Sequence, residues 1–201
     1  MDGINLVSLS EMIRSVGEET VKGYLANFSC PLNHDVEMFL KTKAVEFSRQ
    51  GIAQTKLIFM SHRGEPTLVG YYALANKFIV IPRTKINAKT SKRLSRFSPL
   101  NPETGTYSLP MILIAQLSKN YLAGINDLIS GSVILKLACD SVAEVQRVVG
   151  GKFVYLECEN TPKLIAFYKD SGFCEFGERE LDKDEVGLMK TNKLMQMLKY
   201  L

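Results

Sequence analysis

The chain has 201 residues, of which 46% are hydrophobic and 23% charged, a composition typical of globular proteins that excludes a fibrous or disordered chain. Its net charge of +4 is too small to indicate nucleic-acid binding by itself. No apolar run reaches the roughly 18 to 20 residues that a membrane helix needs, and no secretory signal begins the sequence. We therefore expect a single domain over residues 1–201, cytoplasmic and without a membrane partner.

The N-terminal quarter predicts one strand followed by two helices. Ile4–Leu9 has the pattern of a short strand, and Ser10 is expected to cap a helix that runs towards Phe28. A second helix is expected to begin at an Asp35 N-cap and to stop at Gly51.

The next segment has the signals of a β-hairpin. Lys56–Met60 and Leu68–Ala75 read as strands, and the intervening residues 63–66, Arg-Gly-Glu-Pro, supply turn chemistry. Phe78–Ile81 continues the second strand or starts an adjacent one.

A basic surface insertion over about 82–106 follows, with a short helix expected around Ser91–Phe97. No acid lies between Pro82 and Phe97, whereas six cations do: Arg83, Lys85, Lys89, Lys92, Arg93 and Arg96.

The C-terminal half alternates strands and helices. The expected elements are an apolar strand at Leu109–Leu117, a helix from about Leu128 to Val149, a strand at Phe153–Leu156, a helix from Thr161 to Gly172, a strand pair at Phe173–Phe176 and Val186–Met189, and a helical tail at about 191–201. The order predicts an α+β (α/β) fold with a mixed, mostly antiparallel central sheet flanked by helices.

The cysteines and histidines do not form a recognisable metal or disulfide pattern. The four cysteines are widely spread and the two histidines have no metal-spaced partner, so we expect neither disulfides nor a metal site: Cys30, Cys139, Cys158, Cys174, His34 and His62.

The most specific motif lies in residues 152–173, a strand followed by a helix. Residues 167–173, Phe-Tyr-Lys-Asp-Ser-Gly-Phe, match the aromatic-Tyr-x-x-x-Gly-Phe pattern, and here the chain resembles the GNAT superfamily of acyl-CoA-dependent N-acetyltransferases. The resemblance implies that Tyr168 is the general acid that protonates the departing thiolate of coenzyme A. It also implies that Asn160 lies near the pantetheine arm. The residues alone leave simple core packing open as the role of Tyr168.

A second motif covers residues 107–119, which resemble the fourth strand of the GNAT fold and in particular the version found in toxins of toxin–antitoxin pairs. In that family the strand splays from its neighbour and its main chain bonds the pantetheine amides. The resemblance places these contacts at Leu117, Ser118 and Lys119. A plain central strand is the alternative interpretation.

A third segment corresponds to the pyrophosphate loop of the family. The stretch 119–132 departs from the family pattern Gln/Arg-x-x-Gly-x-Gly/Ala, because its glycines, Gly124 and Gly131, have the wrong spacing. Ser130, Gly131 and Ser132 still suit the start of a helix that binds an anion. Alternatively, the loop merely turns the chain.

The resemblance implies an N-acetyltransferase that moves the acetyl group of acetyl-CoA directly to a primary amine of a small or macromolecular acceptor. One alternative is a toxin-type enzyme that acetylates aminoacyl-tRNA, with the basic insertion contacting tRNA. Another is a non-catalytic acyl-CoA-binding or interaction module with a degenerate pyrophosphate loop. A homodimer and the identity of the general base are left open; Glu157 and Glu159 alternate across one strand, so at most one faces the substrate.

Overall fold

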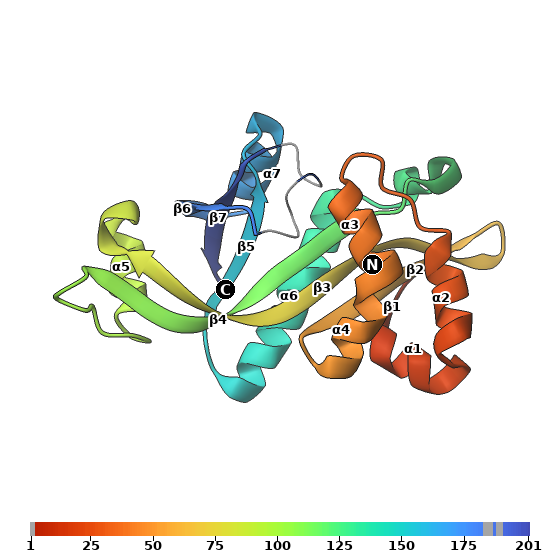
Figure 1. Cartoon of the computed structure of the whole chain (residues 1–201), viewed down its shortest axis with the longest axis horizontal. Helices are drawn as coiled ribbons and strands as arrows, with labels where there is room; N and C mark the ends of the chain where they lie inside the picture. Colours follow the sequence, from red (N-terminus) through yellow and green to blue (C-terminus); the bar gives the residue numbers. More distant parts are fainter. Residues whose placement is uncertain (1–2, 183–186, 188–190) are drawn as a thin grey trace. The chain divides into compact units, whose positions relative to one another are not determined.

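A computed structural model describes residues 3–182, 187 and 191–201 (Figure 1). The chain divides into two compact units, Met1–Ala75 with Ile114–Ala138, and Asn76–Leu113 with Cys139–Leu201. We describe each unit by itself.

The first unit pairs three N-terminal strands with the end of a fourth. β1 (Ile4–Ser8), β2 (Ala53–His62), β3 (Glu65–Pro82) and β4 (Thr106–Lys119) follow one another in this order in the sheet. The β1–β2 and β2–β3 pairs are antiparallel, with Leu6 opposite Ile58. β2 and β3 form the expected hairpin, because Arg63 and Gly64 both adopt positive φ (52° and 85°) in a two-residue turn.

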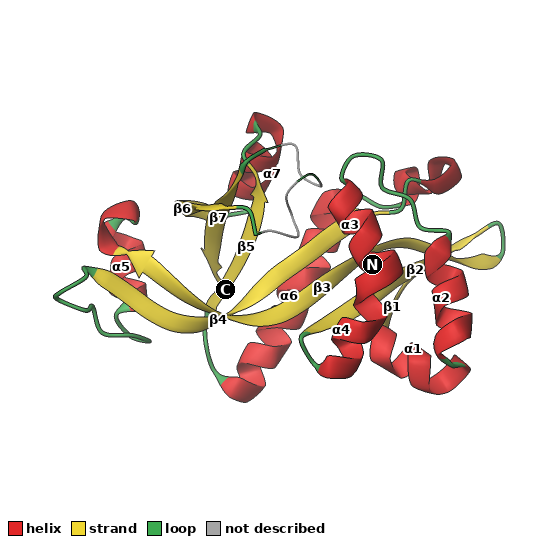
Figure 2. Cartoon of the chain, in the orientation of Figure 1, coloured by secondary structure: helices red, strands yellow, loops and turns green. Residues whose placement is uncertain are grey.

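Helices precede and follow these strands in the first unit (Figure 2). In chain order they are α1 (Leu9–Val16), α2 (Glu18–Ala26), α3 (His34–Met38), the π-helical turn η1 (Phe39–Lys43), α4 (Ala44–Gln50) and the 3-10 segment η3 (Leu122–Leu128). Apolar side chains of α1, α2, η1, β2 and β3 together form a core in which Leu9, Leu25, Leu40, Leu57 and Tyr71 are almost fully buried.

Two expectations for these helices were wrong. The single helix from Ser10 towards Phe28 is two helices, because Gly17 has φ 83° and ψ 156° and cannot continue a helical path; Ser8 is the N-cap residue. The second helix is capped by Asn33, whose Oδ1 accepts from the Val36 N–H at 3.2 Å, and Asp35 lies inside the first turn. Gly51 ends α4 in a left-handed conformation, as expected.

The second unit contains the C-terminal half of β3, the N-terminal half of β4, and three further strands. β5 (Phe153–Glu159), β6 (Cys174–Glu180) and β7 (Lys193–Tyr200) follow β4 in the order β5-β7-β6, and the β5–β7 and β6–β7 pairs are antiparallel. The helical elements that lie wholly in this unit are η2 (Arg83–Lys85), α5 (Ala88–Leu94) and α7 (Pro162–Asp170). Helix α6 (Gly131–Val149) begins in the first unit and ends in this one.

The prediction of a helical tail at about 191–201 is wrong, because residues Lys193–Tyr200 form the strand β7. Leu, Met, Gln and Lys are good helix formers, but this segment is hydrogen-bonded on both edges, with Leu198 opposite both Tyr155 and Cys174. Tertiary pairing therefore overrides helix propensity. Of the expected strand pair, Phe173–Phe176 corresponds to β6, and Val186–Met189 lies outside the described residues apart from Gly187.

The other expected elements are present. The basic insertion separates β3 from β4 and carries α5, and β3 runs on to Pro82, so Phe78–Ile81 continues the second hairpin strand. The long helix begins at Gly131, three residues later than expected. The α/β fold class with a mostly antiparallel sheet flanked by helices is confirmed. Among the described residues, no single helix has the length and apolar character needed to cross a membrane. The helices Leu122–Leu128 and Gly131–Val149, which meet at a bend of 68°, reach that length and apolar character only when they are counted as one segment.

Candidate functional site

The end of β4 in the first unit has a defined main-chain orientation. The carbonyl oxygen of Ser118 lies against Gly70 of β3, and the Asn120 N–H donates to the Val69 carbonyl at 2.8 Å. Successive residues of a strand direct their N–H and C=O groups to opposite edges. Leu117 and Lys119 therefore direct their main-chain groups away from β3, whereas Ser118 faces β3.

Asn120 fixes the chain where it leaves β4. Its side chain is buried, with Nδ2 donating to the Leu68 carbonyl at 2.9 Å and Oδ1 accepting from the main-chain N–H groups of Ser29 and Leu122. Both acceptor directions of the amide oxygen and one of its two N–H donors are therefore used inside the protein. The sequence reasoning missed Asn120, although a lone Asn directly after a buried strand is a recognisable signal for such a junction.

The segment after Asn120 turns sharply before α6. Ala123 (φ 48°) and Gly124 (φ 80°) adopt successive left-handed conformations, and the Lys119 ammonium donates to the Asn126 carbonyl at 3.0 Å. Gly124 therefore has a conformational role here despite its departure from the family spacing.

The first turn of α6 brings Ser130, Gly131 and Ser132 together. The Ser130 and Ser132 hydroxyls are 2.8 Å apart, and the Ser130 hydroxyl accepts from the Val133 N–H at 3.3 Å, as an N-cap does. Both serines are exposed and the first turn contains no acid. A helix start of this kind can bind an anion through its N–H groups and dipole.

Tyr168 and Asn160 belong to the second unit. The Tyr168 ring packs between Phe167 and Phe173, with centroid distances of 5.0 and 6.0 Å. Burial raises the pKa of the Tyr168 hydroxyl above its usual value, and the nearby Cys158 raises it further, so this phenol is protonated at neutral pH. The Asn160 amide lies at the end of β5 and donates to Glu178 at 3.1 Å.

The two acids considered on β5 are not free carboxylates. Glu157 accepts from Arg179 Nε at 2.7 Å, from Gln196 Nε2 at 3.2 Å and from the Tyr155 hydroxyl. These three donors, all in the second unit, hold the Glu157 carboxylate in place. Glu159 is buried and also has an interaction partner.

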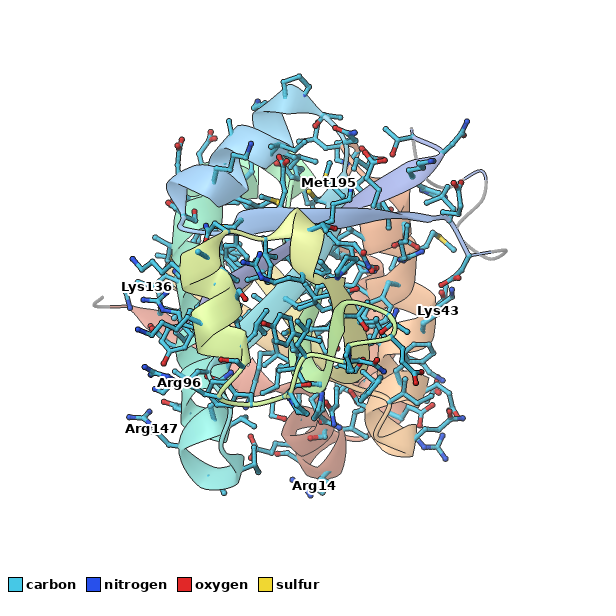
Figure 3. The ribbon with its side chains drawn as sticks, turned by 90° about the vertical axis from the view of Figure 1, so that its left-hand side faces the viewer. Arg14, Lys43, Arg96, Lys136, Arg147 and Met195 are labelled. Carbon is cyan, nitrogen blue, oxygen red and sulfur yellow. The ribbon has the colours of Figure 1, made fainter. Side chains whose placement is uncertain are left out.

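The basic insertion presents most of its cations to solvent. Lys85, Lys89, Lys92 and Arg96 are exposed, and Arg96 is labelled in Figure 3. Arg93 differs, because its guanidinium stacks 4.3 Å above the Tyr200 ring and thus supports the second unit.

A cavity in the second unit is lined by none of the predicted site residues. Its volume is about 360 Å³, and its lining side chains are mainly apolar, including Leu109, Met111 and Phe153. Among the described residues, no group of three or more His, Cys, Asp or Glu side chains could hold a metal ion.

No protein-family model and no curated protein matches this sequence. Solved structures do match. A mutant of the toxin AtaT with one tyrosine replaced by phenylalanine has a TM-score of 0.61 and 18% identity, covering 97% of this chain and 89% of that one. AtaT complexed with acetyl-methionyl-tRNAfMet has a TM-score of 0.59 and 17% identity (96% and 93% covered). AtaTR bound with AcCoA has a TM-score of 0.56 and 19% identity (97% and 93% covered). This similarity confirms the resemblance to toxin-type GNAT proteins at the level of the fold.

Proposed function

We propose that this chain is an N-acetyltransferase of the GNAT type, which transfers the acetyl group of acetyl-CoA directly to a primary amine. The main support is the end of β4, where Leu117 and Lys119 turn their main-chain groups away from β3. The similar structure of AtaTR bound with AcCoA gives the same cosubstrate for a protein of this fold.

The residues of the first unit fit the two polar parts of acetyl-CoA. Pantetheine amides would pair with the main chain of Leu117 and Lys119, as an added strand does. Ser118 was expected to share this role, but its carbonyl faces Gly70, so we assign it to holding β4 in place. The pyrophosphate would bind at Ser130, Gly131 and Ser132, where free helix N–H groups and two hydroxyls meet.

The residues of the second unit would serve the leaving group. Acetyl-CoA is a thioester, and transfer of its acetyl group to the amine releases the thiolate of coenzyme A, which needs a proton. Tyr168 is the proposed donor, because its phenol stays protonated at neutral pH. Asn160 would lie near the pantetheine arm. Glu157 is unsuited to be the general base, because Arg179 holds its carboxylate at 2.7 Å.

Calorimetry with acetyl-CoA tests the proposal most directly. We expect a 1:1 complex that Ser132→Glu weakens at least tenfold by placing a negative charge at the anion site. Ser95→Glu, which adds the same charge at an exposed position after α5, is the matched control and should bind normally. Equal affinity of Ser132→Glu and wild type would exclude the α6 N-terminus as the pyrophosphate site.

Release of free thiol across a panel of amines then tests catalysis. Turnover with any primary amine would support the proposed N-acetyltransferase activity. Binding of acetyl-CoA without turnover on the whole panel would favour a non-catalytic acyl-CoA-binding module.

Aminoacyl-tRNA is a second candidate acceptor. The exposed cations of the insertion and the similar structure of AtaT complexed with acetyl-methionyl-tRNAfMet favour it. We expect salt-sensitive tRNA binding that is lost in the triple variant Lys89→Ala, Lys92→Ala, Arg96→Ala, with acetyl-CoA affinity unchanged. Arg93 is kept because of its contact with Tyr200. Wild-type protein that does not bind tRNA at low salt would refute this acceptor.

A further inference from the structure

The second unit contains a cavity to which the proposed function gives no role. Its volume of about 360 Å³ is in the range of sites that bind small organic molecules. All of its lining residues belong to the second unit. Its apolar walls come from the strands β4 and β5, the residues after α5 and the last turn of α6: Leu109, Met111, Ile112, Phe153, Phe97 and Val149.

One buried polar atom at this cavity has no partner. Gln146 of α6 lines the cavity and is only 8% exposed. Its Nε2 donates to the Phe153 carbonyl at 2.9 Å, and this bond fixes which end of the amide is the oxygen. Within the described part of the chain, Gln146 Oε1 accepts no hydrogen bond. A buried acceptor without a donor costs free energy, and a ligand with a donor would remove that cost.

Further acceptors lie at the same end of the cavity. Helix α6 ends at Val149, and the last carbonyl groups of a helix have no partner within it and carry its negative dipole end. Gly150 and Gly151 follow, and both line the cavity. A Cβ built at Gly150 would meet no atom within 4 Å, so the chain leaves room for a ligand beside these carbonyl groups.

These surroundings define the chemistry of a ligand. The apolar walls favour an aromatic or aliphatic body, and the unused acceptors favour an N–H or O–H donor on it. Lys152 also lines the cavity and is exposed. Its ammonium group disfavours a cationic ligand, whereas the carbonyl groups of α6 disfavour an anionic one.

We propose that this cavity binds a neutral, mostly apolar small molecule that carries an N–H or O–H donor. The apolar body lies among Leu109, Met111 and Phe153, and the donor is directed to Gln146 and the end of α6. None of the residues assigned to acetyl-CoA or to the leaving group lines this site, so the inference does not depend on acetyltransferase activity.

The first experiment compares indole, which has the required N–H, with benzofuran, which has the same shape without it. In protein with ¹³C-labelled methionine methyl groups, indole should shift the Met111 signal in a saturable way, with a Kd below about 1 mM. The Met12 signal of the first unit should stay in place. Benzofuran should bind at least about fivefold more weakly, because it cannot donate a hydrogen bond. A Met111 signal that indole leaves unchanged, or equal affinity for both probes, would overturn the inference.

The second experiment tests the position of the site. The chain contains no tryptophan, so the fluorescence of one introduced indole reports its surroundings. Val149 lines the cavity and Val148 does not, and both side chains are largely exposed, so Val149→Trp and Val148→Trp should both fold.

The attached indole of Val149→Trp should enter the cavity. We expect its emission at shorter wavelength than that of Val148→Trp, and added indole should no longer shift the Met111 signal. Val148→Trp should bind indole like the wild type. Emission typical of an exposed tryptophan in Val149→Trp, or wild-type affinity of this variant for indole, would refute the site.

Discussion

Gly70 of β3 lies directly against the end of β4: a Cβ built at position 70 would stand 2.7 Å from the carbonyl oxygen of Ser118 and 2.7 Å from Cδ1 of Ile134. Such distances are too short for any side chain, and one of the two atoms belongs to the main chain. The absence of a Cβ at position 70 therefore sets how closely β4 and α6 approach β3, which in turn orients Leu117 and Lys119.

Gly70→Ala should consequently displace the end of β4. We expect destabilisation by about 1–3 kcal/mol, the usual cost of overpacking, and weaker acetyl-CoA binding, measured by thermal unfolding and calorimetry. Gly23→Ala is the matched control, because position 23 has open space within a helix; it should stabilise the protein by roughly 0.5–1 kcal/mol. A Gly70→Ala protein as stable as wild type would show that the contact is easily relieved.

Glu37 should make stability depend on acid pH. The hydrogen bond from Lys41 and then the Cys30 N–H lower the pKa of this carboxyl below its usual value of 4.5. A group with a lowered folded-state pKa stabilises the protein above its unfolded-state pKa and loses that contribution as the pH falls through the folded value. Glu37→Gln should therefore cost about 1 kcal/mol at neutral pH.

The cost should shrink when urea unfolding is repeated at successively lower pH below about 4.5. A difference between Glu37→Gln and wild type that stays constant down to pH 3 would contradict the assigned ionic role of Glu37.

Most elements of the fold could be predicted from local sequence patterns. The hairpin follows from Arg63-Gly64, and the end of α4 from Gly51, because each is decided by main-chain conformations that only a few residues tolerate. The tail could not be predicted in the same way. Its residues favour a helix, and only the presence of β5 and β6 on its two edges makes Lys193–Tyr200 a strand.

In the first unit, too, residues close in sequence could be predicted to lie together, whereas residues far apart in sequence could not. Ser130, Gly131 and Ser132 are close in sequence, and their role at a helix start could be inferred from their types. Asp35 and Gln116 are 81 residues apart, so their hydrogen bond depends on how α3 packs against β4. Sequence reasoning accordingly assigned Asp35 to a cap, the commonest role of an Asp near the start of a helix.

The four cysteines should differ sharply in reactivity. Cys30, Cys139 and Cys158 are buried, whereas Cys174 is exposed. Burial, with a smaller effect of Glu175 and Glu159, raises the pKa of the Cys158 thiol to about 11, and the thiolate is the reactive form. At pH 8 the folded protein should therefore incorporate one equivalent of iodoacetamide, and Cys174→Ser should incorporate none. Mass spectrometry that finds Cys158 labelled at pH 8 would contradict this burial.

Tyr168 is the residue on which the proposed chemistry depends most. Its hydroxyl, whose pKa is raised by burial, remains a proton donor at neutral pH, where a departing thiolate with an ordinary pKa of about 8.5 would accept the proton. Its ring has a separate role, because it packs against Phe167 and Phe173. Substitution by phenylalanine separates the two roles.

Tyr168→Phe should keep the fold and the acetyl-CoA affinity, because the ring and its contacts remain. The rate of thiol release on an accepted amine should fall by roughly 10²- to 10⁴-fold, the usual contribution of a positioned proton donor. Tyr24→Phe, which removes a hydroxyl from a 53% exposed ring on α2, is the control and should turn over normally. If Tyr168→Phe releases thiol at the wild-type rate, water or another side chain protonates the sulfur, and Tyr168 contributes only its packing between Phe167 and Phe173.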